Sequence, residues 1–318
     1  RDWDALDDDA RARAIRAMEV NAGMLEAMDF HIGRLLEHLR VTGALENTIL
    51  VVTSDNGPEG GQLLAGSPGQ QAFMRLWLRT HGYTETALED LGGPGSSVAI
   101  GPEWASAAAS PSDLFKFHGA DGALRVPLIM AGPGVPEGGR VDALSVMADV
   151  MPTLLDLVDA DGPTPGARPM TGRSLLPVIA GQAEAVYGEE DLVGIEVAGN
   201  VGLYRGDYKL ARSLPPLGDG QWRVFDLSVD PGETNDLGAQ RPELLAGLLA
   251  DYEVWSRQMG VIEMPPDYAP LREVGRKMGP LLLQRYWPWL LGALALFALG
   301  LVGGGVLLRA GWRRLRPV

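Results

Sequence analysis

The sequence contains no cysteine in its 318 residues. This absence excludes disulfide bonds, thiolate metal sites and cysteine nucleophiles within the chain. It leaves the cellular compartment open, because a protein without disulfides is compatible with any redox environment. The chain begins at Arg1 rather than at methionine, and no signal-like apolar stretch follows. We therefore expect it to be part of a longer protein.

Positive charge is scarce over most of the chain. The net charge is −14, but residues 276–318 carry seven Lys and Arg and no acidic residue, so residues 1–275 combine 20 basic with 41 acidic groups. A body this acidic repels the phosphates of nucleic acids. We therefore expect no nucleic-acid partner, and the acidity by itself identifies no substrate.

Two apolar runs in the first half of the chain indicate an α/β fold. Residues 6–42 have the apolar spacing of a long helix. The β-branched run 48–53 and the run 126–130 are typical of strands buried on both faces of a mainly parallel sheet. The 58–113 excursion between them is long enough to be functional rather than connective. We expect this sandwiched α/β body to occupy residues 1–193.

The sequence pattern changes near residue 194. Short strands separated by Gly-Asp and Asp-Pro-Gly turns precede a helix predicted over 242–259. This pattern predicts a small antiparallel sheet with a packed helix as a subdomain over 194–260. A proline-containing linker over 261–286 follows.

The C-terminal stretch 287–308 contains 22 residues without a charge. Such a helix is about 30 Å long, enough to span a bilayer, although a buried core helix is the alternative. Four arginines follow in the tail 309–318. The positive-inside rule then predicts a single membrane span, a cytoplasmic tail and a body on the extracytoplasmic (periplasmic) side.

The polar turn after the first apolar run is the clearest candidate site. Asp55 and Asn56 follow a strand directly, at the edge of a sheet where ligands gather in open α/β folds. A carboxylate beside an amide carbonyl supplies two hard oxygens, which suit calcium or magnesium. The alternative is an ordinary Asx turn, in which both side chains bond their own backbone.

Six segments in order resemble the sulfatase family of the alkaline-phosphatase superfamily, over about residues 10–260. The resemblance is closest to bacterial arylsulfatases that insert a large segment before a substrate lysine. It implies that this chain corresponds to the C-terminal portion of such an enzyme. The matching segments are MDFHIGRLL (28–36), NTILVVTSDNG (47–57), RVP through GPG (125–134), DVMPTLLDL (149–157), GRSLLP (172–177), and YKL (208–210) with LSVDPGETNDL (227–237).

The resemblance implies roles for individual residues. Asp55 and Asn56 would be ligands of a divalent cation, calcium rather than magnesium. Lys116, just before the Arg-Val-Pro segment, would contact the substrate sulfate, whereas the alternative is an ordinary surface lysine. His118 is placed to donate a proton to a leaving group, but no family motif falls on it and a structural histidine is the alternative.

The nucleophile is absent from the sequence. Sulfatases use a formylglycine made from Cys or Ser in a Cys/Ser-x-Pro-x-Arg motif, and no Ser here has Pro at +2 and Arg at +4. The resemblance therefore places the formylglycine upstream of this chain, together with the remaining metal ligands. This chain alone should be inactive.

Three functions fit these observations. The first is hydrolysis of a small-molecule sulfate ester by the full-length protein. The second is hydrolysis of phosphonate monoesters or phosphodiesters on the same scaffold. The third is a non-catalytic, membrane-anchored sulfatase-like protein. The sequence sets neither the natural substrate nor the oligomeric state.

Overall fold

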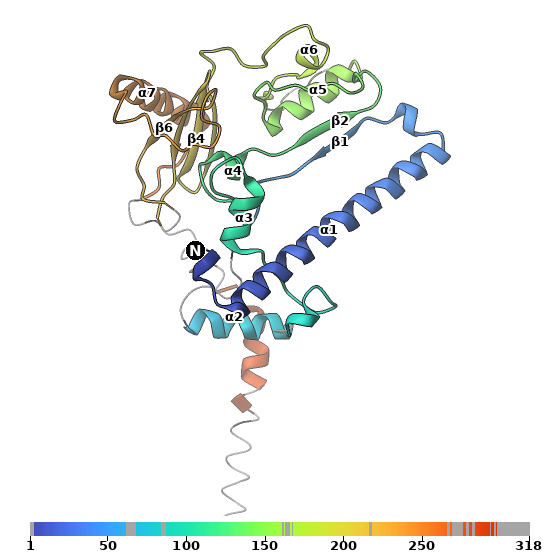
Figure 1. The fold of residues 1–318 in the computed structure, drawn as a ribbon, viewed down its shortest axis with the longest axis vertical. Coiled ribbons are helices and arrows are strands. Elements are labelled where there is room, and N and C mark those ends of the chain that lie inside the picture. Colours follow the sequence, from blue (N-terminus) through green and yellow to red (C-terminus); the bar gives the residue numbers. More distant parts are fainter. Residues whose placement is uncertain are drawn as a thin grey trace, which may run out of the picture. The chain divides into compact units, whose positions relative to one another are not determined.

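The computed structural model of the 318-residue chain describes residues 3–61, 68–83, 87–160, 162, 166, 168–215, 218–265, 268, 276–277, 280–281, 284–292, 294–295 and 297. Its elements are shown in Figure 1. Short helical turns lie at η1 (Trp3–Ala5), η2 (Leu45–Asn47), η3 (Leu88–Asp90) and η4 (Met147–Asp149).

The predicted N-terminal helix is present as α1 (Asp8–Val41). Asp7 caps it, because its carboxylate accepts a hydrogen bond from the Ala10 backbone N–H at 2.8 Å. Among the described residues of this helix only Ala17 is buried. Met24 is 67% exposed and Met28 is 53% exposed, so much of the apolar face that predicted the helix lies open in this chain.

The prediction of a mainly parallel sheet is wrong for the strands described. β1 (Leu50–Thr53) and β2 (Leu128–Ala131) pair antiparallel, with Leu50 opposite Ala131 and Thr53 opposite Leu128. They are also only half-buried, since Val52 is 41% and Ile129 60% exposed. A β-branched run reports strand propensity but not strand direction, which depends on where the next strand enters the sheet.

The long excursion between these strands contains helices. They are α2 (Pro68–Thr80) and α3 (Gly101–Ala109), and the single turn α4 (Asp121–Leu124) follows before β2. Trp104 on α3 donates its indole N–H to the Ala14 carbonyl of α1 at 2.8 Å. Trp104 therefore packs α3 onto α1.

A buried aspartate organises the segment after β2. Asp149 lies just before α5 (Val150–Leu157) and is fully buried. Its carboxylate accepts hydrogen bonds from the Val146 N–H, the Arg173 N–H and the Tyr187 hydroxyl, at 2.7, 2.7 and 2.5 Å. These bonds tie α5 to the chain on either side of α6 (Leu176–Ile179), which stabilises the buried charge.

The predicted small antiparallel sheet with a packed helix is present. Its strands are β3 (Val193–Val197), β4 (Asn200–Arg205), β5 (Tyr208–Arg212) and β6 (Arg223–Asp226), paired in sequence order. α7 (Pro242–Met259) lies along this sheet in Figure 1 and ends at Gly260, which has φ of 69°. The fully buried side chains of Leu203, Leu210 and Leu248 form the core between sheet and helix.

The C-terminal membrane span predicted over 287–308 lies largely outside the described residues, which end at residue 297. Within the part of the chain that the structure describes, no helix is both long and apolar enough to cross a bilayer. The boundary between two compact units of the chain falls between Ile262 and Glu263.

Candidate active site

The turn after β1 presents two oxygen-bearing side chains. Asp55 is exposed, and among the described residues its carboxylate makes no hydrogen bond or ion pair. The Asn56 amide nitrogen donates to the Gly57 carbonyl at 2.8 Å, which directs its other amide atom, the oxygen Oδ1, away from that bond. An Asx turn would use the Asp55 oxygens to accept backbone N–H groups, and this turn does not. Both side-chain oxygens are therefore available to a ligand.

Glycines bring this turn against the segment that carries Lys116. The Gly57 N–H donates to the Ala123 carbonyl at 2.9 Å, and a Cβ at Gly57 would lie 1.8 Å from the Gly122 carbonyl oxygen. A Cβ at Gly60 would meet the Phe115 ring at 2.3 Å. Any larger residue at these glycines would separate the two loops, so their sequence is adapted to this contact.

Lys116 lies beside the turn. Its backbone N–H donates to the Pro58 carbonyl at 3.0 Å, two residues beyond Asn56. Its ammonium lies 3.1 Å from the Glu59 carboxylate and 5.1 Å from the centre of the Phe117 ring. The side chain is 30% exposed, so the charge can reach a bound anion.

Glu59 was not among the residues predicted from the sequence. One carboxylate oxygen accepts the Gly61 N–H at 2.8 Å while the other faces Lys116. The sequence feature that could have identified Glu59 is its position, three residues after Asn56 in the same turn. A surface loop commonly carries such a residue without any role, so the pattern alone does not single it out.

His118 occupies a buried position, with 6% of its surface exposed. Its Nδ1 lies 2.8 Å from the Phe115 carbonyl oxygen, and its ring packs edge-on against the Phe115 ring. These contacts shape the turn after Lys116. The suggested role of His118 as a proton donor stays a prediction. Its contacts with Phe115 show that His118 packs within the loop.

A buried ionic cluster anchors the Lys116 segment to the C-terminal sheet. Lys209 on β5 is fully buried, and its ammonium lies 2.5 Å from both Asp121 and Glu233. Tyr204 donates to the same Asp121 oxygen at 2.7 Å, and the Asp121 N–H donates to Glu233 at 2.8 Å. Asp121 begins α4, five residues after Lys116, so this cluster fixes the end of the loop that bears Lys116.

Burial shifts the pKa of two members of this cluster, Glu233 and Tyr204. It raises the pKa of Glu233, opposed by the Lys209 charge, and it raises the pKa of Tyr204 well above its usual value with a further contribution from Asp121. Two carboxylates around one ammonium leave an excess negative charge inside the protein. The cluster therefore depends on Lys209 for its stability.

A cleft of about 1000 Å³ borders the candidate site. The turn after β1 contributes Ser54, Asn56 and Glu59, and the approach to β2 contributes Arg125. α1 contributes apolar side chains to the lining, among them Val20 and Met24. The walls of the cleft are therefore partly polar and partly apolar, as is common in small-molecule pockets.

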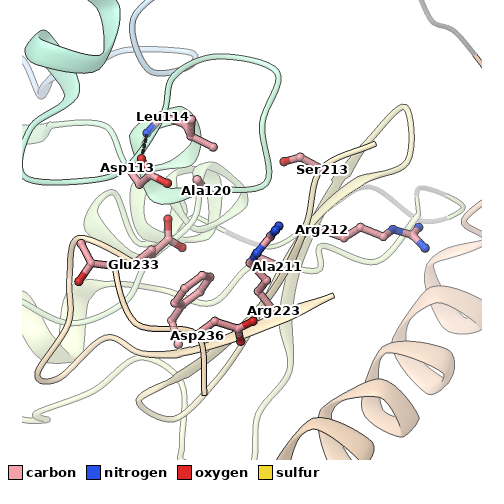
Figure 2. A pocket seen from close by; sticks show the side chains of 11 residues that line it. Asp113, Leu114, Ala120, Ala211, Arg212, Ser213, Arg223, Glu233 and Asp236 are labelled. Atoms are coloured by element: carbon pink, nitrogen blue, oxygen red, sulfur yellow. Dashed lines mark hydrogen bonds between the residues drawn. The ribbon is translucent and has the colours of Figure 1, made fainter. Parts of the chain in front are cut away.

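A second cavity of about 330 Å³ lies between β5, β6 and the segment 113–120. Figure 2 shows Asp113, Glu233 and Asp236 around it, with Arg223 reaching in from β6. Arg223 is paired there with the Asp219 carboxylate, through contacts of 3.1 and 2.6 Å. This cavity lies behind the Lys116 loop and borders the buried ionic cluster.

The cation suggested by the resemblance fits Asp55 and Asn56 as part of its ligand set. Both offer uncommitted hard oxygens, the donor type that calcium prefers. Calcium takes about six to eight oxygens, more than these two side chains supply. Within the described residues, no group of three or more His, Cys, Asp or Glu is arranged to hold a metal ion. Asp55 and Asn56 thus fit as a partial site.

Comparison with known proteins supports the resemblance. The Sulfatase family profile matches residues 3–160. An uncharacterized sulfatase of Schizosaccharomyces pombe is 32% identical over 279 residues, 84% of this chain and 48% of that protein. An arylsulfatase of Klebsiella aerogenes is 32% identical over 164 residues, 51% of this chain and 33% of that protein. The chain thus spans between about a third and a half of the length of these curated relatives.

A solved structure gives the same result for the fold. The crystal structure of Ps i-CgsB in complex with k-i-k-neocarrahexaose superposes with a TM-score of 0.52 at 20% identity, covering 81% of this chain and 46% of that chain. At this identity the likeness shows a common fold only. By sequence, this chain is homologous to sulfatases, and it shares a fold with this solved structure.

Proposed function

We propose that this chain supplies the cation-binding and anion-binding loops of a hydrolase that cleaves small-molecule sulfate esters. One observation carries the proposal: the backbone contacts that lock the Lys116 loop onto the turn bearing Asp55 and Asn56. A divalent cation site and a fixed ammonium then lie side by side. An ester that carries a negative charge at its reacting group is the substrate such a pair suits.

Asp55 and Asn56 would hold the cation through a carboxylate oxygen and the amide Oδ1. Calcium bound there would draw electron density from the sulfate oxygens and so favour attack at sulfur. The hydrogen bond from the Asn56 amide to Gly57 keeps the amide oxygen in place for this role. Because the turn is held at Gly57 by Ala123, the ligands need little rearrangement.

Lys116 would donate a hydrogen bond to a sulfate oxygen and offset the negative charge that develops on the leaving oxygen. An ammonium suits this role because it is a compact charge with three donors. Its 30% exposure leaves it accessible to substrate. The nucleophile, which the resemblance identifies as a formylglycine, would come from a polypeptide segment other than residues 1–318, since the chain has no Cys and no Ser in the required motif.

Kinetics of Lys116→Ala in the whole protein test the proposal. With an aryl sulfate as substrate, we expect kcat/KM to fall on the order of 100-fold, the usual cost of removing one donor to a developing negative charge. Lys277→Ala, a substitution in the linker region, serves as the matched control and should leave the rate unchanged. Wild-type kinetics in Lys116→Ala would remove this lysine from the site.

A parallel assay separates sulfate-ester hydrolysis from the related chemistry. An aryl phosphonate monoester and an aryl phosphodiester should be cleaved more slowly than the aryl sulfate. A reversed order would make the protein a phosphonate monoester or phosphodiester hydrolase. No turnover of any of the three by the whole protein would favour a non-catalytic binding role.

We also propose that the protein is anchored to a membrane by residues 287–308, with its body on the extracytoplasmic side. The charge-free stretch and the four arginines after it support this arrangement. The protein should remain in the membrane fraction on alkaline extraction and should lose this property when residues 287–318 are deleted. Release of the intact protein by alkali would contradict the anchor.

A further inference from the structure

Glu59 is the acidic residue in contact with the candidate anion-binding lysine. Its Oε2 lies 3.1 Å from the Lys116 ammonium. Its Oε1 accepts the Gly61 N–H at 2.8 Å, so the carboxylate is fixed at both ends. Neither the proposed cation ligands nor the proposed anion contact requires a carboxylate at this position.

The contact limits where the Lys116 ammonium can go. A lysine side chain on a surface loop samples many rotamers, and an ion pair with an anchored carboxylate restricts it. The backbone of the two residues is joined as well, because the Lys116 N–H donates to the carbonyl of Pro58 next to Glu59. Glu59 therefore holds the ammonium at the edge of the turn that bears Asp55 and Asn56.

The Glu59 carboxylate also repels any anion that binds to Lys116, and the repulsion grows with the charge of that anion. An anion oxygen that accepts a hydrogen bond from the ammonium comes within about 6 Å of Glu59, given a charge-assisted bond of about 2.8 Å. Repulsion between like charges at this distance is weakened by solvent, since Glu59 is 48% exposed. A dianion experiences twice this repulsion, and at about 6 Å in a solvent-screened setting the extra charge corresponds to roughly a threefold penalty from Glu59. The Lys116 ammonium attracts both anions, so the contribution of Glu59 appears as a change in the ratio of their affinities when Glu59 is neutralised.

We propose that Glu59 is a positioning and specificity residue that shifts the preference of the site toward monoanionic esters, such as sulfate monoesters, and away from dianionic phosphoryl groups of the same shape. The inference rests on the proposed function, because it assigns Glu59 a task at the anion site of that function. Sulfate monoesters carry one negative charge at neutral pH, whereas phosphate monoesters carry nearly two. The discrimination acts through charge and therefore does not require a difference in pocket shape.

The test compares two inert anions of the same skeleton. Benzenesulfonate and phenylphosphonate are titrated calorimetrically into the calcium-loaded whole protein at about pH 8.5, where the phosphonate carries two charges. The quantity compared is the ratio of the two dissociation constants in wild type and in each variant. Glu59→Gln should strengthen the binding of phenylphosphonate relative to benzenesulfonate by roughly threefold, whereas Glu59→Asp should keep the ratio close to that of wild type. Asp251→Asn, which removes the carboxylate partner of Arg205 in the C-terminal subdomain, is the control and should not change the ratio.

Two outcomes would overturn the inference. One removes only the role of Glu59, and the other removes the proposed function as well. If wild type binds benzenesulfonate and Glu59→Gln leaves the ratio unchanged, the anion site survives and the role of Glu59 does not. If wild type binds neither anion and hydrolyses no aryl sulfate, the proposed function fails and the inference fails with it.

Discussion

A lysine is buried and fully paired in the C-terminal subdomain, whereas the lysine in the loop beside the Asp55–Asn56 turn is partly exposed. Lys209 on β5 is fully buried between Asp121 and Glu233, whereas Lys116 is 30% exposed and faces one carboxylate. The same contrast holds within residues 1–193, where Asp149 before α5 is fully buried and accepts three hydrogen bonds, whereas the described contacts of Asp55 include none.

This difference distinguishes residues that stabilise the fold from residues that are available to bind a ligand. Buried charges must be paired, so Lys209 is committed to folding. Groups that bind a ligand must instead remain available and be held in place by other residues. Asp121 connects the two regions, because it pairs with Lys209 and also begins the helical turn that contacts Gly57. The sheet thus supports the loops that would perform the chemistry.

Substituting each lysine by methionine gives the largest expected contrast. Lys209→Met leaves two buried carboxylates without their cation and should lower the free energy of unfolding by about 3–5 kcal/mol. Lys116→Met removes a surface ion pair and should change it by less than about 1 kcal/mol. Urea unfolding followed by circular dichroism measures both. Equal effects would contradict the division of tasks between the two regions.

Glu233→Gln sharpens the same comparison. The amide can keep an oxygen for the Asp121 N–H and removes the excess negative charge, so it should cost clearly less than Lys209→Met. A cost as large as that of Lys209→Met would mean that Glu233, rather than Lys209, is the group on which the cluster depends. The same unfolding titration compares the two variants.

A smaller effect is expected from the Arg173–Asp191 pair. Arg173, followed by the Gly188 N–H, lowers the pKa of Asp191 to about 2. Because this folded-state pKa is below the usual value, the pair stabilises the protein above about pH 4, and the stabilisation is lost as the pH falls toward 2. The side chains are 48% and 33% exposed, so the contribution should be less than about 1 kcal/mol.

Asp191→Asn checks this expectation. Wild type should be more stable than the variant at about pH 6, and the two should converge as the pH approaches about 2. The midpoints of urea unfolding across this range provide the measurement. A difference that persists unchanged at low pH would exclude the ion pair as its cause.

Periodicity and turn residues predicted the helices and the C-terminal sheet well. The apolar spacing placed helices at α1 and α7, and Gly260 ends α7 with a positive φ. These features are local, so sequence spacing reports them directly. The direction of β1 relative to β2 was predicted wrongly, because it depends on a pairing between residues about 80 positions apart.

The candidate site was predicted in part. Asp55, Asn56 and Lys116 were identified from motifs, and the structure brings the Lys116 loop onto the turn. The buried cluster could not be foreseen, because Lys209 and Asp121 are 88 residues apart and the Asp121 N–H bond to Glu233 joins residues 112 apart. Glu59 was missed for a different reason, since a single acidic residue in a surface loop carries no spacing signal.

Calcium titration of the whole protein tests the central claim most directly. Calorimetry should show one calcium site whose affinity falls by at least about 100-fold in Asp55→Ala, because a charged oxygen ligand is lost. Asp142→Ala, which alters an exposed aspartate paired with Arg140, is the matched control and should bind calcium as wild type does. Unchanged calcium affinity in Asp55→Ala would contradict the assignment of the turn after β1 as a cation site.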